Sequence, residues 1–321
     1  MTSSTQSLVS VIIPVRNGIS HIREAIDSVL GQSYRQLEII VVDDGSDDFD
    51  YARLKEIDRR IEVVRLPGCG VSRARNTGMR HAKGKYFAFL DADDVWFPGK
   101  LEAQMRYFDD HPDVGCVFGG FLKWRRDESS GAFPPARSLW RDCGGMSGSA
   151  PERSGWIYTR LLSGLLVGMN TAVIRREVFD LLGGFDESMR IGEDYMFWLK
   201  TSRVFEMHAL DGPVALYRIH SSSAMNRLSE ENHQARLLRI ARERWDLVNP
   251  DGSGLSLESF RKRLALTEFT HGYNHYWHGN PAVAARAFRA AVAGNALPVR
   301  SAVYYLLSQW KRLLGAFYKR Q

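Results

Sequence analysis

The sequence is poor in cysteine and has no long apolar run. Its three cysteines, Cys69, Cys116 and Cys143, share no close spacing, so they indicate neither a disulfide framework nor a zinc site. No stretch approaches the roughly 20 apolar residues that a membrane-spanning helix needs. The N-terminal residues MTSSTQS lack the basic and then apolar pattern of a secretory signal. We therefore expect a protein of the reducing cytoplasm, either free or peripheral at the inner face of the membrane.

Most of the chain also lacks an excess of charge. Of its 321 residues 44% are hydrophobic, enough for a sizeable core, and the formal net charge is +6. Residues 227–321 hold 15 Lys or Arg and 7 Asp or Glu, a net charge of +8, so the preceding residues carry −2. This distribution argues against a nucleic-acid groove in the main part, and allows a basic C-terminal region to contact anionic lipid or an acidic partner.

Apolar runs of strand length alternate with segments of helical periodicity through the first 225 residues. Strands are predicted at 8–15, 37–42, 61–65, 87–90, 114–121, 170–174, 204–208 and 214–219, and helices between the first strands at 21–30, 48–59, 72–82 and 98–110. Strand and helix in alternation indicate an α/β fold with a doubly wound, mostly parallel, Rossmann-like sheet flanked by helices. Because the pattern is helical from residue 229 onward, we expect two domains, residues 1–225 and a basic helical region at 226–321.

The last predicted helix combines apolar and basic residues. Val303, Leu306, Trp310 and Leu313 recur at helical spacing, with Lys311 and other basic residues among them. This pattern indicates packing on the rest of the protein or on a partner subunit, or else an interfacial helix at a membrane surface.

Carboxylates follow two of the predicted strands. The stretch FAFLDADDVW at 87–96 places Asp91, Asp93 and Asp94 after a buried run, and Asp43 and Asp44 follow the strand at 37–42. In open α/β sheets ligands bind at the carboxyl ends of the strands. Clustered carboxylates repel one another unless a cation lies among them, and their hard oxygens suit Mg²⁺ or Mn²⁺. The alternative is a polar turn that leads into the next helix, and for Asp94 we expect a helix cap.

Five stretches occur in this order: VSVIIPVRNG, LEIIVVDDGSDD, GVSRARNTGMRHAKGKYFAFLDADD, LLGGFDESMRIGEDYMFWLK and YRIHSSSAM. They span about residues 8–225. Together they resemble the motifs of the inverting glycosyltransferases of family 2, which have the GT-A fold. The resemblance implies an enzyme that moves a sugar from a nucleoside-diphosphate sugar, by default a UDP-sugar, to an acceptor hydroxyl. The implied acceptor is a saccharide or a lipid-linked sugar in polysaccharide or glycolipid synthesis.

The resemblance also implies which residues bind the donor. They are Pro14, Arg16, Asn17, Asp43, Asp44, Arg75, Asp91 and Arg218. An aromatic residue is frequent in the family where Arg16 stands, although a guanidinium can also stack on a base. Only one of Asp43 and Asp44 can face the nucleotide if the strand extends that far, because side chains alternate along a strand. Arg75 either reaches the donor or braces the acidic cluster.

By the same resemblance, a divalent cation, Mn²⁺ or Mg²⁺, is held by Asp93 and Asp91, with His220 as a further metal or phosphate contact. Glu193 and Asp194 match the catalytic acidic pair. Asp194 is our first choice for the general base and Glu193 the second; a base within about 3 Å of the acceptor contributes roughly 10²–10⁴ in rate. Acidic residues in a first helical turn also suit the helix dipole without any catalytic role.

Two other functions remain as alternatives. A sugar-phosphate nucleotidyltransferase would use a related sheet and a metal, but it would need a Gly-rich phosphate loop with a basic residue where VRNGIS stands. A non-catalytic nucleotide-binding scaffold would be expected to lack the Asp93 or Asp194 carboxylate, and both are present.

Overall fold

The computed structural model describes residues 6–141, 148–220 and 228–318. The chain divides into two compact units. The first comprises Met1–Ile157 and Leu166–His220, and the second comprises Tyr158–Leu165 and Ser221–Gln321. Each unit is described by itself below.

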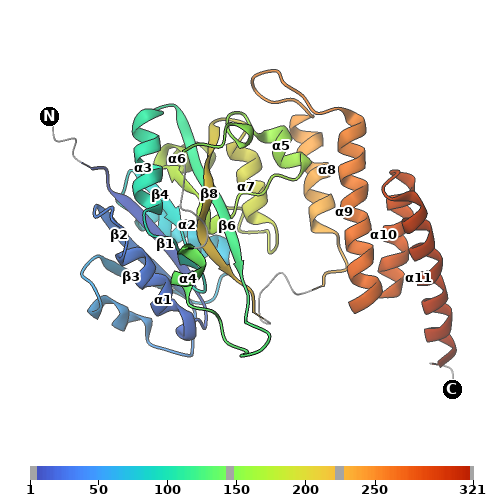
Figure 1. Cartoon of the computed structure of the whole chain (residues 1–321), viewed down its shortest axis with the longest axis horizontal. Helices are drawn as coiled ribbons and strands as arrows, with labels where there is room; N and C mark the ends of the chain where they lie inside the picture. Colours follow the sequence, from blue (N-terminus) through green and yellow to red (C-terminus); the bar gives the residue numbers. More distant parts are fainter. Residues whose placement is uncertain (1–5, 142–147, 221–227, 319–321) are drawn as a thin grey trace. The chain divides into compact units, whose positions relative to one another are not determined.

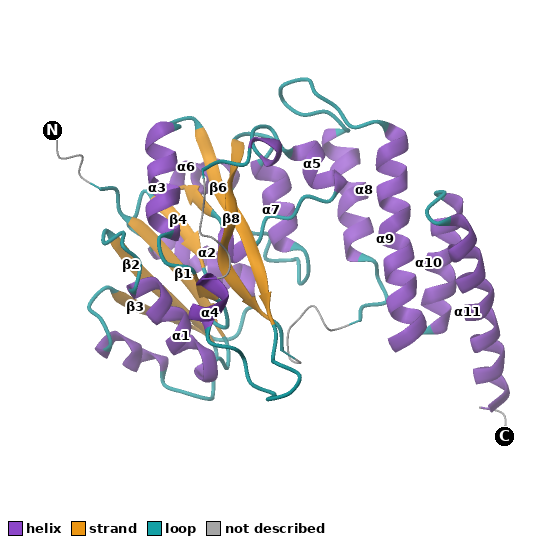
Figure 2. Ribbon diagram, viewed as in Figure 1, coloured by secondary structure: helices purple, strands orange, loops and turns teal. Residues whose placement is uncertain are grey.

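The first unit is built on one sheet of eight strands in the order β3-β2-β1-β4-β7-β6-β8-β5. Figures 1 and 2 show the strands with helices packed around them. The strands are β1 (Val9–Val15), β2 (Leu37–Asp44), β3 (Ile61–Leu66), β4 (Tyr86–Phe89), β5 (Val95–Trp96), β6 (Val114–Trp124), β7 (Val173–Arg175) and β8 (Glu206–Arg218).

The first four strands in this order, β3-β2-β1-β4, are parallel, as the sequence predicted. The register places Val9 beside Leu37 and also beside Tyr86, so β1 lies between β2 and β4. Every residue of β1 is buried, which is typical of a parallel strand covered on both faces. The strand β7 is antiparallel to β4 and to β6, and β6 is parallel to β8. The sheet is therefore mixed, with a parallel half that carries the first two acidic strand ends.

Helices cover both faces of this parallel half. On one face, α1 (Ile19–Leu30) and α3 (Lys100–Asp110) pack in the same core cluster as Val9, Val11 and Ile13. On the other face, α2 (Val71–His81) comes so close to β1 that a Cβ on Gly78 would lie 2.6 Å from Ile12 Cγ2. Because Ile12 alternates with its neighbours along the strand, α2 must cover the opposite face. The fold is doubly wound.

Several predicted boundaries differ from the structure. The helix expected at 48–59 is a short 3₁₀ turn, η1 (Tyr51–Glu56), and β5 was not predicted. The two strands expected at 204–208 and 214–219 are one strand, β8. The sequence Asp211, Gly212 and Pro213 predicts an interruption of the strand. The structure instead has a register irregularity that places Gly120 of β6 opposite Pro213, so the pairing of β6 with β8 continues.

The remaining helices of the first unit are short. They are α4 (Ala136–Arg141), α6 (Arg176–Leu182) and α7 (Glu193–Thr201), with 3₁₀ turns η2 (Pro151–Arg153) and η3 (Met169–Thr171). Of these, α7 follows Gly192, whose φ of 80° lies in the left-handed region that favours glycine. Gly192 thus turns the chain so that the helix begins at the acidic pair Glu193 and Asp194.

The second unit is helical. It comprises α5 (Tyr158–Ser163), α8 (His233–Trp245), α9 (Leu257–His278), α10 (Pro281–Ala293) and α11 (Pro298–Tyr318). Phe269 of α9 and Phe288 of α10 lie in its core, with Tyr304 of α11 packed against them. The Tyr158 hydroxyl donates to the carbonyls of Ala241 and Asp246 at 3.0 and 2.8 Å, which joins α5 to α8. In the described part of the chain, no helix has the length and apolar composition needed to cross a membrane.

Candidate active site

The loop after β4 gives three neighbouring carboxylates three different environments. Asp94 is 1% exposed. Its Oδ1 accepts from the Arg218 backbone N–H at 2.9 Å and its Oδ2 accepts from Asn170 Nδ2 at 2.6 Å. Burial, followed by repulsion from Asp91 and Asp93, raises the pKa of Asp94 well above its ordinary value. The expectation that Asp94 caps the next helix is wrong, because α3 begins at Lys100 after Gly99. Asp94 instead fastens the loop to the end of β8.

Asp93 and His220 face one another. Asp93 Oδ2 lies 2.7 Å from His220 Nε2, and both side chains are partly exposed. The structure thus brings together two of the residues predicted to contact the metal. Among the described residues, no group of three or more His, Cys, Asp or Glu side chains has the geometry of a metal site. The Asp93 carboxylate nevertheless suits Mn²⁺ or Mg²⁺, because such ions bind nucleotides through one or two carboxylates together with the substrate phosphates.

Arg75 connects the two acidic clusters. Its Nη2 lies 2.8 Å from Asp91 Oδ1 and its Nη1 lies 3.0 Å from Glu193 Oε1, while its side chain is 5% exposed. The guanidinium also lies over the Phe185 ring, 5.5 Å from the centroid. Of the two roles considered for Arg75, these contacts favour bracing the acidic cluster.

The acidic pair at the start of α7 is divided between a buried and a more accessible residue. Burial is the largest cause that raises the pKa of Glu193, followed by repulsion from Asp194, whereas Arg75 acts in the opposite direction. Asp194 is only half-buried, and its Oδ1 accepts from the Tyr195 backbone N–H at 2.7 Å. Of the pair, Asp194 is therefore the more accessible carboxylate.

Arg218 lies at the end of β8 and is buried. Its Nε donates to the Asp93 carbonyl at 2.7 Å, its Nη2 pairs with Glu24 of α1, and its guanidinium lies 3.9 Å from the centroid of the Trp124 ring. These contacts hold the 91–94 loop against β8. They place Arg218 beneath the loop, so its predicted contact with the donor stays a prediction.

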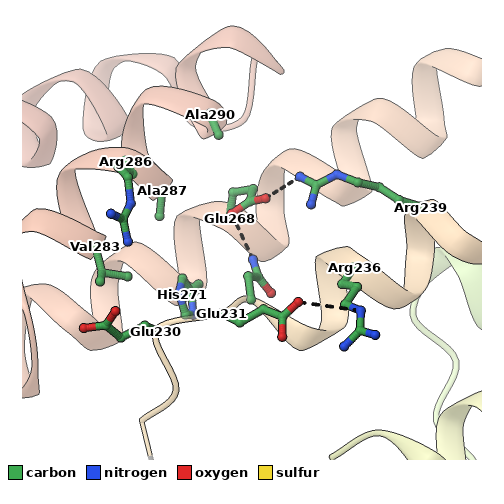
Figure 3. Close-up of a pocket in the computed structure, with 11 residues that line it drawn as sticks. Glu230, Glu231, Arg236, Arg239, Glu268, His271, Val283, Arg286, Ala287 and Ala290 are labelled. Atoms are coloured by element: carbon green, nitrogen blue, oxygen red, sulfur yellow. Dashed lines mark hydrogen bonds and ion pairs between the residues drawn. The ribbon is translucent and has the colours of Figure 1, made fainter. Parts of the chain in front are cut away.

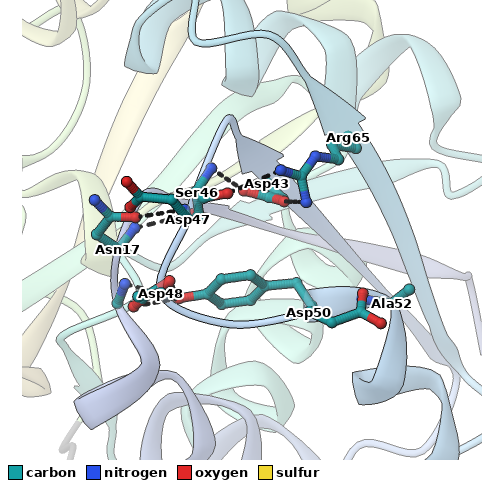
Figure 4. A network of polar contacts seen from close by, with 10 residues as sticks. Asn17, Asp43, Ser46, Asp47, Asp48, Asp50, Ala52 and Arg65 are labelled. Atoms are coloured by element: carbon teal, nitrogen blue, oxygen red, sulfur yellow. Dashed lines mark hydrogen bonds and ion pairs between the residues drawn. The ribbon is translucent and has the colours of Figure 1, made fainter.

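The loop after β1 is tied to the loop after β2 (Figure 4). Asn17 has a φ of 52°, its backbone N–H donates to Ser46 Oγ at 3.0 Å, and its Oδ1 accepts from the Asp47 N–H at 3.0 Å. Pro14 is buried within β1, whereas Arg16 is exposed. This bracing places the Arg16 side chain at the carboxyl end of the strands, close to Gly68. A Cβ added to Gly68 would lie 3.7 Å from Arg16 Nη1.

Asp43 and Asp44 both lie within β2, so their side chains point to opposite faces. Asp43 Oδ1 accepts from the Ser46 N–H at 2.8 Å, and its Oδ2 lies 3.2 Å from Arg65 Nη1. Asp44 accepts from the backbone N–H groups of Cys69 and Gly70 at 2.6 and 2.8 Å. Asp43 therefore closes the turn after its own strand, and Asp44 holds the glycine loop that precedes α2.

Three further residues contact or surround the acidic cluster without having been predicted: Glu24, Asn170 and Tyr217. Burial raises the pKa of Tyr217 to about 12, and repulsion from Asp94, Asp91 and Asp93 adds to the rise. Tyr217 is the first residue of the YRIHSSSAM motif, whereas Glu24 and Asn170 belong to none of the five motifs. They reach the cluster through strand pairing and helix packing, which the sequence does not display.

A pocket of about 260 Å³ lies in the second unit, between α8, α9 and α10 (Figure 3). Its acidic and basic residues are partly paired with one another. Arg239 lies 2.6 Å from Glu268, and Arg236 lies 3.6 Å from Glu231. Its lining contains three arginines and three glutamates, so the formal charges of these residues balance.

Comparisons with known proteins identify the family of this chain. The family model for glycosyl transferase family 2 matches residues 10–150. An uncharacterised glycosyltransferase of Rickettsia prowazekii is 35% identical over 230 residues, which cover 70% of this chain and 69% of the relative. The chain belongs to glycosyltransferase family 2. Another relative of this family 2 enzyme is an Escherichia coli UDP-Glc:α-D-GlcNAc-diphosphoundecaprenol β-1,3-glucosyltransferase, 28% identical over 75% of this chain and 85% of the relative.

Solved structures share the fold of this family 2 glycosyltransferase. Staphylococcus aureus TarS 1–349 in complex with UDP-GlcNAc aligns with a TM-score of 0.63 at 17% identity, over 98% of this chain and 92% of TarS. A mannosyltransferase of Pyrobaculum calidifontis, in complex with GDP-Man and Mn²⁺, aligns with a TM-score of 0.57 at 22% identity, over 97% and 81%. These structures confirm the predicted GT-A fold. Membership of family 2 confirms the prediction that the protein is a glycosyltransferase.

Proposed function

We propose that this family 2 glycosyltransferase catalyses metal-dependent, inverting transfer of a sugar from a UDP-sugar to an acceptor hydroxyl. The observation that carries the proposal is the position of Arg75 between Asp91 and Glu193. This contact joins the loop of the predicted metal ligands to the helix of the predicted base. The two acidic groups that an in-line displacement needs therefore belong to one cluster.

Asp194 is the general base in this proposal. An attacking hydroxyl needs a proton acceptor on the face of the sugar opposite the diphosphate, so Asp91 and Asp93 cannot fill both positions. Glu193 is buried and paired with Arg75. Asp194 lies next to it and is more accessible, which suits a residue that takes a proton from a bound acceptor.

Asp93, with Asp91 and His220 beside it, would hold the divalent cation. When bound, Mn²⁺ or Mg²⁺ offsets the negative charge that develops on the leaving diphosphate. The protein's own part is positional, because Asp94 and Arg218 fasten the loop that carries Asp93 to β8. Arg16, Asn17, Asp43 and Asp44 line or brace the strand ends where the nucleotide would lie, and Pro14 supports them from within β1.

The acceptor is proposed to be a saccharide or a lipid-linked sugar in polysaccharide or glycolipid synthesis. The Escherichia coli relative carries both UDP-Glc and a diphosphoundecaprenol acceptor in its name, and TarS is solved with UDP-GlcNAc. Both support a UDP-sugar donor and a lipid-linked acceptor here. We place the reaction in the cytoplasm, at the inner face of the membrane.

The test combines a donor screen with one substitution. Nucleotide-sugar turnover should require Mn²⁺ or Mg²⁺ and stop with a chelator, and the product should have the inverted anomeric configuration. Asp194→Asn should keep its affinity for UDP, because the base does not hold the nucleotide, while turnover falls by roughly 10²-fold or more.

Asp186→Asn is the matched control, because Asp186 lies in the exposed loop before α7, where its carboxylate accepts from the backbone N–H and the hydroxyl of Ser188. It should retain near wild-type turnover. A retained anomeric configuration, or Asp194→Asn turnover within about threefold of wild type, would contradict the mechanism. If Glu193→Gln alone is inactive, the base is Glu193.

A further inference from the structure

Helix α11 presents its most apolar side to solvent. Four of its large side chains are strongly exposed: Val299 at 75%, Leu306 at 66%, Trp310 at 62% and Leu313 at 72%. With Val303, Leu307 and Leu314, which are also exposed, they form one continuous strip that we name the apolar stripe. At 100° per residue these seven side chains fall within about 120° of the helix circumference.

The opposite side of α11 makes the contacts with its own unit, and it is the more polar side. Ser301 and Ser308 are fully buried, and their hydroxyls donate to the carbonyls of Ala296 and Tyr304 at 2.7 Å. Between them, Tyr304 stacks on Phe288 with 5.3 Å between ring centroids. A surface helix normally buries its apolar face. The reversed arrangement leaves the apolar stripe free for an external surface.

The charge of this region is of one sign. Residues 298–321 contain five Lys or Arg and no Asp or Glu. Lys311 Nζ donates to the Tyr276 carbonyl at 2.9 Å, and Arg312 is exposed and bonded to Gln309 on its own helix. By the same helical geometry Arg300 and Lys311 adjoin the apolar stripe, whereas Arg312 lies on another side of the helix. An exposed apolar strip with Trp, next to basic residues and free of acids, matches the physical requirements for binding at an anionic lipid interface.

A second copy of the chain fits the same strip less well. Val299, Val303, Leu306, Trp310 and Leu313 follow the alternating 4-3 spacing of a coiled-coil seam. The flanking positions in that register include Arg300, Leu307, Gln309 and Leu314, which provide no opposite charges to pair two such helices. Leu307 and Leu314 also widen the strip beyond a two-helix seam.

We propose that the apolar stripe of α11 docks on an anionic lipid surface. The helix would lie in the plane of the interface with its Ser and Tyr side held by α9 and α10. This inference deepens the proposed function, because it names the surface on which the enzyme would meet a lipid-linked acceptor.

The test is flotation of the full chain with vesicles of phosphatidylcholine containing about one third phosphatidylglycerol. We expect the wild type to float at low salt and to be largely released at about 0.5 M salt, where surface charges are screened within a few ångströms. The double variant Leu306→Ser/Leu313→Ser should bind about 10- to 30-fold more weakly, because two interfacial leucines are lost.

The matched control is Leu166→Ser/Leu181→Ser, which changes two leucines that are equally exposed, at 62% and 64%, outside α11. It should bind vesicles like the wild type. Vesicle binding that is absent in the wild type, or unchanged in the stripe variant, would overturn the proposal. The proposal would also be overturned if sedimentation showed that the wild type is a dimer and that the stripe variant, but not the control variant, is a monomer. UDP affinity, measured by calorimetry on the same proteins, should not change, so a failed donor site is distinguished from a failed lipid contact.

Discussion

Removing the charge of Arg75 should destabilise the protein in a pH-dependent manner. Arg75→Met keeps most of the side-chain length but leaves Glu193 buried without its cation. Breaking a buried ion pair by removing one partner costs about 3–5 kcal/mol. The share that comes from Asp91 is reduced by solvent, because that side chain is 32% exposed. We therefore expect a loss of about 3 kcal/mol in the free energy of unfolding at pH 8.

The sign of the pH dependence follows from Glu193. Burial already raises its pKa in the folded protein, and Arg75 opposes that rise. Without Arg75 the pKa of Glu193 in the folded protein should rise further, while its pKa in the unfolded chain stays at about 4.3. Below the unfolded value Glu193 is protonated in both states, so the substitution costs little. As the pH increases, the cost should grow until the pH exceeds the folded-state pKa.

Urea unfolding of both proteins at pH 4.5 and pH 8, followed by circular dichroism, measures this difference. Arg73→Met is the matched control, because Arg73 lies two residues earlier on α2, is exposed, and is 3.8 Å from Glu187. Arg75→Met/Glu193→Gln should recover part of the lost stability, since it removes both partners. A loss equal to that of Arg73→Met, or equal losses at the two pH values, would refute the reasoning.

Two further substitutions test the metal site and the fold. Asp93→Asn should lose most of its Mn²⁺-dependent UDP affinity in calorimetry while circular dichroism stays native, because it removes a carboxylate charge that the cation needs; unchanged affinity would contradict the assignment. Gly78→Ala should lower the free energy of unfolding by about 1–3 kcal/mol through overpacking, since its Cβ would lie 2.6 Å from Ile12 Cγ2; unaltered urea stability would contradict the close packing of α2 on β1.

The parallel half of the sheet could be predicted because its strands carry their own signal. The buried runs at β1, β2 and β4 are apolar on both faces, so each is recognisable without its neighbours. β5 was not predicted because it has only two residues, and its strand conformation depends on pairing with Leu216 and Ala215 of β8. η1 was expected to be a longer helix, yet Asp50 caps a short 3₁₀ turn there. Short elements depend on partners that lie far away in the sequence.

The sequence predicts a set of acidic residues for the candidate site, but it does not predict which contacts each of them makes. The position of Asp94 at the end of a loop suggests a helix cap, whereas its actual partners, Asn170 and the backbone of Arg218, are 76 and 124 residues away. Similarly, Arg75 belongs to a local motif, but only the folded chain shows that it meets Glu193, 118 residues later. Motif spacing identifies chemical groups, and tertiary packing determines which of them are free to react.

Burial and pairing together explain how so many acids can occupy one site. The buried carboxylate of Asp94 accepts two hydrogen bonds, from Asn170 and from the Arg218 backbone, so its role is structural. Arg75 offsets the charge of both Asp91 and Glu193. Two carboxylates of the cluster are not paired with Arg75. Asp93 lies beside His220, and Asp194 is in no ion pair among the side chains that the structure describes. These are the two carboxylates that the proposed reaction needs, one toward the diphosphate and one toward the acceptor. Because a single arginine links the two clusters, any change at Arg75 should affect both of their positions at once.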